Sequence, residues 1–186
     1  MIPRAAAVLL ALVLAWVGAP ARVLATPQVT SDLSVGGGAR FVPGATPGVF
    51  SMALRADVLF GPPGPYVPRV GPFVSVRTDD FNDLVPAAGV SFLVPLTSTT
   101  PLVLSVGGAV DLTAPSRAGV LGRLWWGSRS YNYHFAYGLT VGVWVEGRYL
   151  PAHGNGTDTA DLIAGADFDL EVFSLPFILF YNWVAR

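Results

Sequence analysis

A long run of alternating side chains, at residues 133–150, sets the tightest limit on how this chain can fold. Its odd positions are apolar apart from Gly147, and its even positions are mostly small, polar or charged. Side chains alternate between the two faces of a β-strand, whereas a helix would space apolar residues three and four positions apart. Aromatic residues stand at both ends of the apolar face, as they do in strands that cross a lipid bilayer. The run therefore predicts a membrane-crossing strand.

The rest of the chain repeats this pattern in segments separated by clusters of Pro, Gly, Asn and Asp. With the run above they number nine: 29–41, 49–60, 67–79, 85–96, 102–113, 117–129, 133–150, 160–172 and 175–183. Single-chain bacterial membrane barrels have an even number of strands. The length of the chain favours eight strands, with ten as the alternative.

The charged residues of these segments lie on one face only. Of the 21 charged residues after the first 25 positions, three fall in turns, one is the C-terminal arginine, and the rest occupy the polar parity. An arginine that faces lipid at mid-depth costs about 2–4 kcal/mol, so a lipid-facing surface excludes charge. Only helices and closed barrels cross a bilayer, because every backbone polar group must be paired. We therefore predict an all-β fold, a closed antiparallel up-and-down transmembrane β-barrel.

A soluble, lipocalin-like ligand-binding barrel also alternates, but it turns the charged face outward and the apolar face inward. The polar face of this chain is mostly Gly, Ala, Ser and Thr with scattered Arg and Asp, which suits a crowded interior better than a solvated surface. All eleven basic residues are Arg, although soluble β-proteins usually protect their surfaces and edges with Lys and Glu. These features favour the membrane interpretation.

The first 25 residues have the pattern of a cleaved secretory signal peptide. Arg4 supplies the positive charge, residues 5–17 form an apolar core, and small-residue cleavage sites end at Ala21 and Ala25. The apolar core is shorter than the roughly 20 residues that a spanning helix needs. We therefore expect export, with residues 1–25 as the signal and residues 26–186 as the barrel domain.

Composition argues against several other functions. The chain has no cysteine, which removes disulfides, thiol catalysis, thiolate metal sites and the lipid anchor of a lipoprotein. A net charge of -1 gives no electrostatic reason to expect a nucleic-acid partner. The two histidines, His134 and His153, have no serine beside them in a catalytic motif. We expect no enzyme activity, no catalytic residues and no cofactor, and a lipid-modifying enzyme is the weakest alternative.

Over residues 28–186 the pattern resembles the small bacterial outer-membrane β-barrels of the OmpA/OmpX type. The resemblance is one of pattern and not of a specific motif. It implies location in the outer membrane, contact with outer-membrane lipid, and handling by the barrel-assembly machinery during biogenesis. Members of that class usually end in an aromatic residue, whereas this chain carries Tyr181 and Trp183 but finishes with Arg186. The oligomeric state is left open.

The inward-facing charges are expected to fill the barrel. An eight-stranded barrel has an interior just wide enough for side chains, and balanced charges inside it should form bidentate Arg–carboxylate pairs. The predicted lumen network comprises Asp32, Arg55, Asp57, Arg69, Arg77, Asp111, Arg117, Arg123, Glu146, Arg148, Asp161, Asp167, Asp169 and Glu171, and the same face carries Arg40, Asp79 and Arg129.

The last four acids of that network lie on one face of one segment and could bind a cation. We expect Arg123 and Arg148 to neutralise them instead, so no metal site is predicted. A polar interior filled in this way predicts a structural or adhesive role. The alternative is a narrow passive, porin-like channel, which ten strands would favour.

Overall fold

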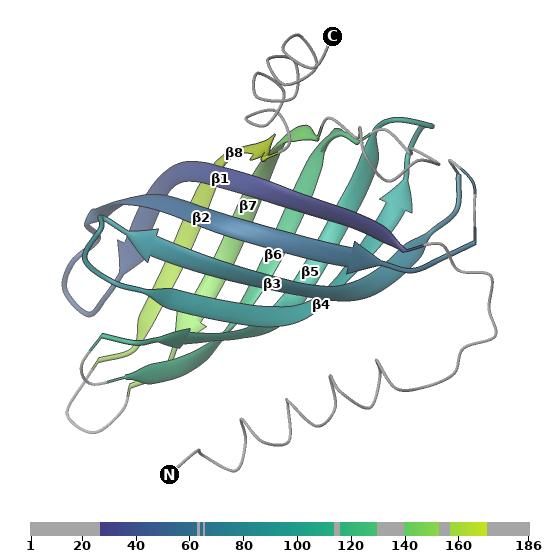
Figure 1. Ribbon diagram of the computed structural model, residues 1–186. Helices are drawn as coiled ribbons and strands as arrows, with labels where there is room; N and C mark the ends of the chain where they lie inside the picture. Colours follow the sequence, from purple (N-terminus) through teal and green to yellow (C-terminus); the bar gives the residue numbers. More distant parts are fainter. Residues whose placement is uncertain are drawn as a thin grey trace, which may run out of the picture.

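Eight antiparallel strands form a closed barrel in the computed structural model of the chain, which describes residues 27–62, 64, 66–113, 116–129, 140–152 and 157–170. The strands follow one another around the barrel in chain order: β1 (Gln28–Phe41), β2 (Gly48–Leu59), β3 (Arg69–Asp79), β4 (Val85–Pro95), β5 (Pro101–Asp111), β6 (Arg117–Ser128), β7 (Val141–Leu150) and β8 (Thr159–Asp169). Pairing of β1 with β8 closes the sheet, and Figure 1 shows β2 and β3 crossing in front of β7 and β8. The prediction of an all-β, up-and-down barrel of eight strands is confirmed, and the count of ten is not realised.

Strand bounds follow the alternation closely. For seven of the predicted segments the observed ends lie within three residues of the expected ones. Within the run 133–150 the structure describes the chain from Thr140 onward, and β7 begins at Val141. The predicted signal peptide 1–25 and the predicted segment 175–183 lie outside the described residues. In the described ranges there is no helix long and apolar enough to cross a membrane.

The barrel has two distinct ends. At the end that we call the terminal end, β1 begins and β8 finishes. The opposite end, which we call the distal end, carries tight turns between paired strands. In the β1–β2 turn, Val42 and Ala45 form an isolated bridge around Gly44, whose φ of 81° suits glycine. In the β3–β4 turn, Asp80 and Phe81 both have positive φ.

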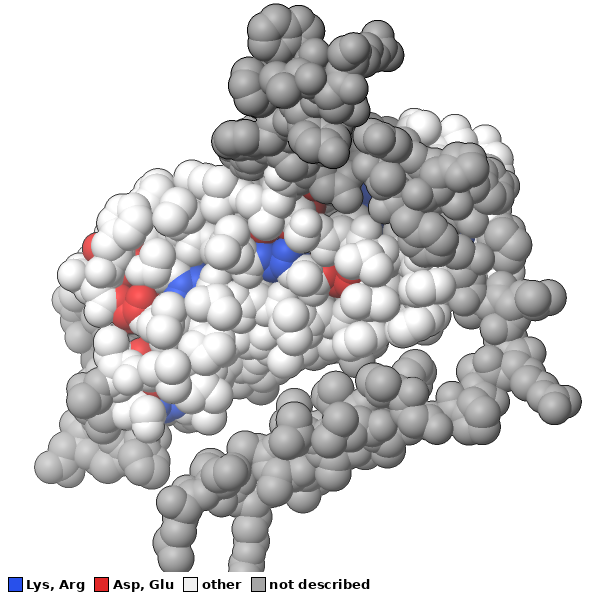
Figure 2. All heavy atoms as spheres, viewed as in Figure 1, with Lys and Arg blue, Asp and Glu red and all other residues white. Residues whose placement is uncertain are grey.

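Burial alternates residue by residue, so every strand has an outward and an inward row. Along β7, exposed and buried residues alternate without a break. No outward position of the eight strands carries a charged residue, and most carry Val, Leu, Phe or Ala. In Figure 2 the barrel wall in view is accordingly mostly uncharged, with charged atoms visible only as small areas. Charged side chains are thus confined to the inward face of the sheet, and the outward face is uncharged and mostly apolar.

The inward rows are less uniformly polar than the sequence suggested. One buried apolar cluster consists of Val49, Leu59, Leu93, Val103, Trp125, Trp144 and Ile163, and a second of Phe73, Val85, Ala109 and Leu121. Glycines on neighbouring strands make room for the largest of these side chains. A Cβ at Gly142 would lie 2.5 Å from the ring of Trp125, which packs there against bare backbone. The interior is therefore filled by apolar side chains as well as by ion pairs.

Candidate functional site

The predicted lumen network lies on the inward rows, in groups spread along the barrel. Thirteen of its fourteen members are described; all of these are buried except Arg117, which is half-buried. The fourteenth, Glu171, lies outside the described residues. Strand register accounts for part of the grouping, because it sets Arg123 opposite Glu146 and Arg148 opposite Asp161. Other contacts run across the interior between strands that are not neighbours.

The distal end holds a compact ring of ion pairs that we call the distal cluster, formed by Arg40, Asp79, Asp83, Arg148 and Asp161. Arg40 lies 3.0 Å from both the Asp79 and the Asp161 carboxylates. Arg148 donates to the same two carboxylates, so each arginine bridges the two acids. Because Asp79 belongs to β3 and Arg148 to β7, the cluster links two walls of the barrel. The side chains of both acids are almost fully buried.

Asp83 joins the distal cluster from the β3–β4 turn. Its carboxylate lies 3.7 Å from Arg40 and accepts the backbone N–H of Asp79 at 2.6 Å. Burial raises the pKa of the Asp83 carboxyl above its ordinary value, although the hydrogen bond from Asp79 opposes the rise. Sequence reasoning placed Asp83 in a turn and missed this role. A nearby ion pair joins Asp111 to Arg117 at 3.0 Å across the β5–β6 pair.

The middle of the barrel is crossed by a second group of charges. Arg77 on β3 reaches Glu146 on β7 at 2.6 Å, and Arg123 lies 3.8 Å from the same carboxylate. Arg123 also contacts Asp167, and its guanidinium lies 4.4 Å from the ring centre of Trp144. A guanidinium over an aromatic face gains a cation–π attraction. Asp161 and Asp167 of β8 are thus paired with the arginines that were expected to neutralise them, Arg148 and Arg123 respectively.

A third group surrounds Arg55, also in the interior. Its guanidinium donates to Asp57 at 2.8 and 2.9 Å, and to the hydroxyls of Ser91 and Ser105 at 2.8 Å each. It also lies 4.0 Å from the ring centre of Phe73. Ser91 in turn donates to Asp57 at 2.5 Å. This network ties β2 to β4 and β5. The hydroxyl and ring partners were not predicted, although their inward parity was the available signal.

The terminal end holds a further group of buried charged residues. Arg129 donates to the Thr30 hydroxyl at 2.7 Å, yet its Nε has no hydrogen-bond partner and it makes no ion pair with a carboxylate of the described residues. Arg69 donates to the backbone carbonyl of Pro62 at 3.1 Å. Asp169 accepts the backbone N–H of Thr140 at 3.2 Å. Within the described ranges, buried side-chain atoms without a hydrogen-bond partner occur at both ends of the barrel, among them Thr140 Oγ1 here and Asp79 Oδ1 in the distal cluster.

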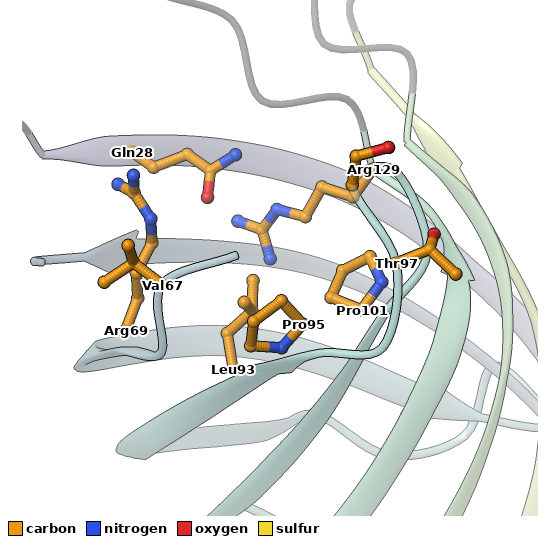
Figure 3. Close-up of a pocket in the computed structure, with 9 residues that line it drawn as sticks. Gln28, Val67, Arg69, Leu93, Pro95, Thr97, Pro101 and Arg129 are labelled. Carbon is orange, nitrogen blue, oxygen red and sulfur yellow. The ribbon is translucent and has the colours of Figure 1, made fainter. Parts of the chain in front are cut away.

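A small pocket opens among these terminal-end residues. Its lining consists of Gln28, Val67, Arg69, Leu93, Pro95, Thr97, Ser98, Pro101 and Arg129, and its free volume is about 20 Å³. A cavity needs roughly 10–15 Å³ to hold one water, so this pocket has room for little more than one water molecule. Figure 3 shows the Arg129 guanidinium pointing toward the Gln28 amide, with the Arg69 guanidinium nearer the other end of the Gln28 side chain.

The arrangement as a whole holds the walls of the barrel together. Arginines reach across the interior to acids on other walls, and the apolar clusters occupy the space between them. In the described ranges no group of three or more His, Asp or Glu side chains is arranged to hold a metal ion. His134 and His153, the two candidates for acid–base catalysis, lie outside the described residues.

Comparison with known proteins adds no relative to this description. No family model matches the chain, and neither a curated protein nor a solved structure matches it. The protein is a small, closed, eight-stranded antiparallel β-barrel, and this fold is consistent with the OmpA/OmpX-type class.

Proposed function

We propose that this protein is a small outer-membrane β-barrel with a closed interior and a structural or adhesive role. The observation that carries the proposal is the sorting of charge. The outward rows of all eight strands are free of charged residues, whereas the inward rows carry the arginines and acids. A soluble barrel has the opposite need, since charged side chains keep its outer surface in water.

The extent of the apolar surface supports the same proposal. Large apolar side chains are exposed on every strand, among them Leu54, Val74, Val106, Val120 and Val143, each more than half exposed. Monomeric soluble proteins rarely expose continuous apolar patches above a few hundred Å². A lipid environment removes this conflict, because it solvates apolar side chains and excludes charges.

Strand length also fits a bilayer. A tilted transmembrane strand needs roughly 9–11 residues, and the eight strands have between 10 and 14. Closure of the barrel pairs the edge strands β1 and β8, which leaves no open edge inside the hydrocarbon. The proposed partners are therefore outer-membrane lipid and, during biogenesis, the barrel-assembly machinery. Export by the predicted signal peptide belongs to the same proposal.

The filled interior favours a closed barrel over the porin-like channel. The ion pairs of Arg77 and Arg148 span between β3 and β7, and buried apolar side chains, among them Trp125 and Trp144, also pack in the interior. The test is conductance of the purified protein in a planar bilayer. We expect a quiet baseline after insertion that has been verified by protease protection. Steady ohmic steps of uniform size would contradict the closed interior and support the channel.

An exposed aromatic residue at the distal end favours the adhesive role. Phe81 is 68% exposed, and its ring lies 5.6 Å from that of Phe50. Its φ of 59° is unusual for a bulky residue, and such strain is found most often at functional positions. If this tip is adhesive, Phe81→Ser should reduce binding of cells that carry the barrel to surfaces or other cells while leaving barrel assembly intact. Unchanged binding would leave the structural role.

A further inference from the structure

The terminal-end pocket, defined by the nine lining residues given above, has a lining suited to an anion. Its polar side chains are two guanidinium groups, the Gln28 amide and the hydroxyls of Thr97 and Ser98, all of which can donate hydrogen bonds. None of the lining residues that the structure describes is an acid. The rest of the wall is apolar, which lowers the local dielectric and strengthens any charge interaction inside it.

Arg129 is a pocket residue with a buried N–H donor that has no hydrogen-bond partner in the described part of the chain. It is only 6% exposed, and it uses one guanidinium nitrogen for the Thr30 hydroxyl while its Nε has no partner. Guanidinium carries five N–H donors in a planar fork that matches the oxygens of a carboxylate or a phosphate. A buried donor without an acceptor costs free energy that an incoming oxygen would recover.

The two acids that act most strongly on Arg129 do not supply the missing hydrogen-bond acceptor. Asp57 acts on Arg129 electrostatically but is already bound by Arg55 at 2.8 and 2.9 Å. Asp32 also acts on Arg129, and neither acid makes an ion pair with it among the described residues. Arg69 adds a second positive charge on the same pocket. The pocket therefore brings together two guanidinium groups and one buried N–H donor, Arg129 Nε, that has no acceptor among the residues described.

We propose that the terminal-end pocket binds one oxyanion group, a carboxylate or a phosphate, between Arg69 and Arg129. The free volume of about 20 Å³ admits only the oxygen end of such a group, so the remainder of the ligand must extend out of the barrel end. The group can belong to a free metabolite or to a lipid headgroup. The proposal depends on the fold and the pocket alone, and it stands or falls independently of membrane location.

The test follows the Nε–H resonances of arginine side chains in the full-length mature protein, folded in a neutral maltoside detergent. Acetate and inorganic phosphate are titrated in turn against chloride at constant ionic strength. The chain has eleven Arg, two of which lie in the predicted signal peptide, so the signals are few, and Arg→Gln variants assign them. We expect a saturable shift of the Arg129 signal. Arg117, which is paired with Asp111 at the other end of the barrel, should not respond.

Variants separate the site from general salt effects. Arg129→Gln should weaken binding at least about tenfold, because it removes a charge-assisted hydrogen bond, while the matched Arg117→Gln should leave binding unchanged. If Arg129→Gln fails to fold, Ser98→Ala in the β4–β5 turn serves instead, with a smaller loss expected.

A second arm identifies the source of the anion. In lipid nanodiscs with phosphatidylglycerol and no added anion, an Arg129 signal already at its saturated position means a lipid phosphate, and a shift only on adding acetate or phosphate means a soluble ligand. Either result supports the site. Arginine signals that drift together in proportion to added salt, or an Arg129 signal that responds in neither arm, would overturn it.

Discussion

An arginine placed on the outward row should be costly in the middle of the barrel and cheap at its end. Val106 is the sixth of eleven residues in β5 and is 66% exposed. Leu112 follows the same strand on the same parity, directly beyond its last residue, and is 53% exposed. With a rise of about 3.3 Å per residue and a strand tilt of roughly 40°, the two sites differ by about 15 Å in depth.

The expected magnitudes follow from that depth. Arginine facing lipid costs about 2–4 kcal/mol at the bilayer midplane and about 0–1 kcal/mol near the interface. The cross-strand neighbours of Val106 are Val90 and Gly122, neither of which offers a carboxylate to pair with the new charge. Val106→Arg should therefore be less stable than Leu112→Arg by about 2–3 kcal/mol, roughly a 30- to 160-fold difference in the folding equilibrium constant.

Reversible urea unfolding from phospholipid vesicles, followed by tryptophan fluorescence, measures both variants against the wild type. The reasoning requires a large loss for Val106→Arg and a small one for Leu112→Arg. Equal, near-zero losses for the two variants would refute it, because a water-facing surface accepts arginine equally well at both exposed positions. A large loss for both would mean that the apolar surface extends beyond the strand ends.

Two further substitutions probe the interior, and urea unfolding measures both. Asp79→Asn should cost about 3–5 kcal/mol, because it removes one of the two buried carboxylates that Arg40 and Arg148 share and leaves both guanidinium groups on Asp161, whereas Asp83→Asn should cost under about 1 kcal/mol, because the amide oxygen still accepts the same hydrogen bond; equal losses would contradict the distal cluster. Gly142→Ala should be strongly destabilising because its Cβ would meet Trp125 at 2.5 Å, while Gly122→Ala enters open space and should be neutral; a neutral Gly142→Ala would refute this packing.

Much of the fold could be predicted because the alternation of side chains shows directly which positions share a face of the sheet. A strand reverses its side chains at every residue, so the row of Arg69 and Arg77 is inward if the row of Val70 and Val74 is outward. One face of the barrel must be uncharged if it meets lipid, and this constraint applies to all strands at once. The inward position of the charges follows from the same pattern, whereas the alternation alone marked nine segments, and the count of eight also needed the even number of strands in such barrels and the length of the chain.

The composition of the interior could not be predicted in the same way. Trp125 and Trp144 share a parity with Arg123 and Glu146, so alternation marks them all as inward without saying where the rings lie relative to the ion pairs, such as the Trp144 ring beside the Arg123 guanidinium. That placement depends on glycines such as Gly142, which leave room for a ring on the neighbouring strand.

Partner choice in the network was predictable only between adjacent strands. Asp111 and Arg117 lie opposite each other in an antiparallel pair, and a turn between two segments is enough to suggest their contact. The pair Arg77–Glu146 joins β3 to β7. Its formation depends on barrel closure and on the stagger between strands, which no single segment encodes.

The central claim is that the barrel is folded in the outer membrane, and gel mobility tests it most directly. Outer-membrane and soluble fractions of cells that produce the protein are run in cold detergent, with and without boiling. Closed membrane barrels remain folded in cold detergent and change mobility after heating. A barrel folded in the outer membrane should give a heat-dependent shift of the band in the outer-membrane fraction. A single band without a shift, found in the soluble periplasm, would contradict it and would point to a soluble barrel.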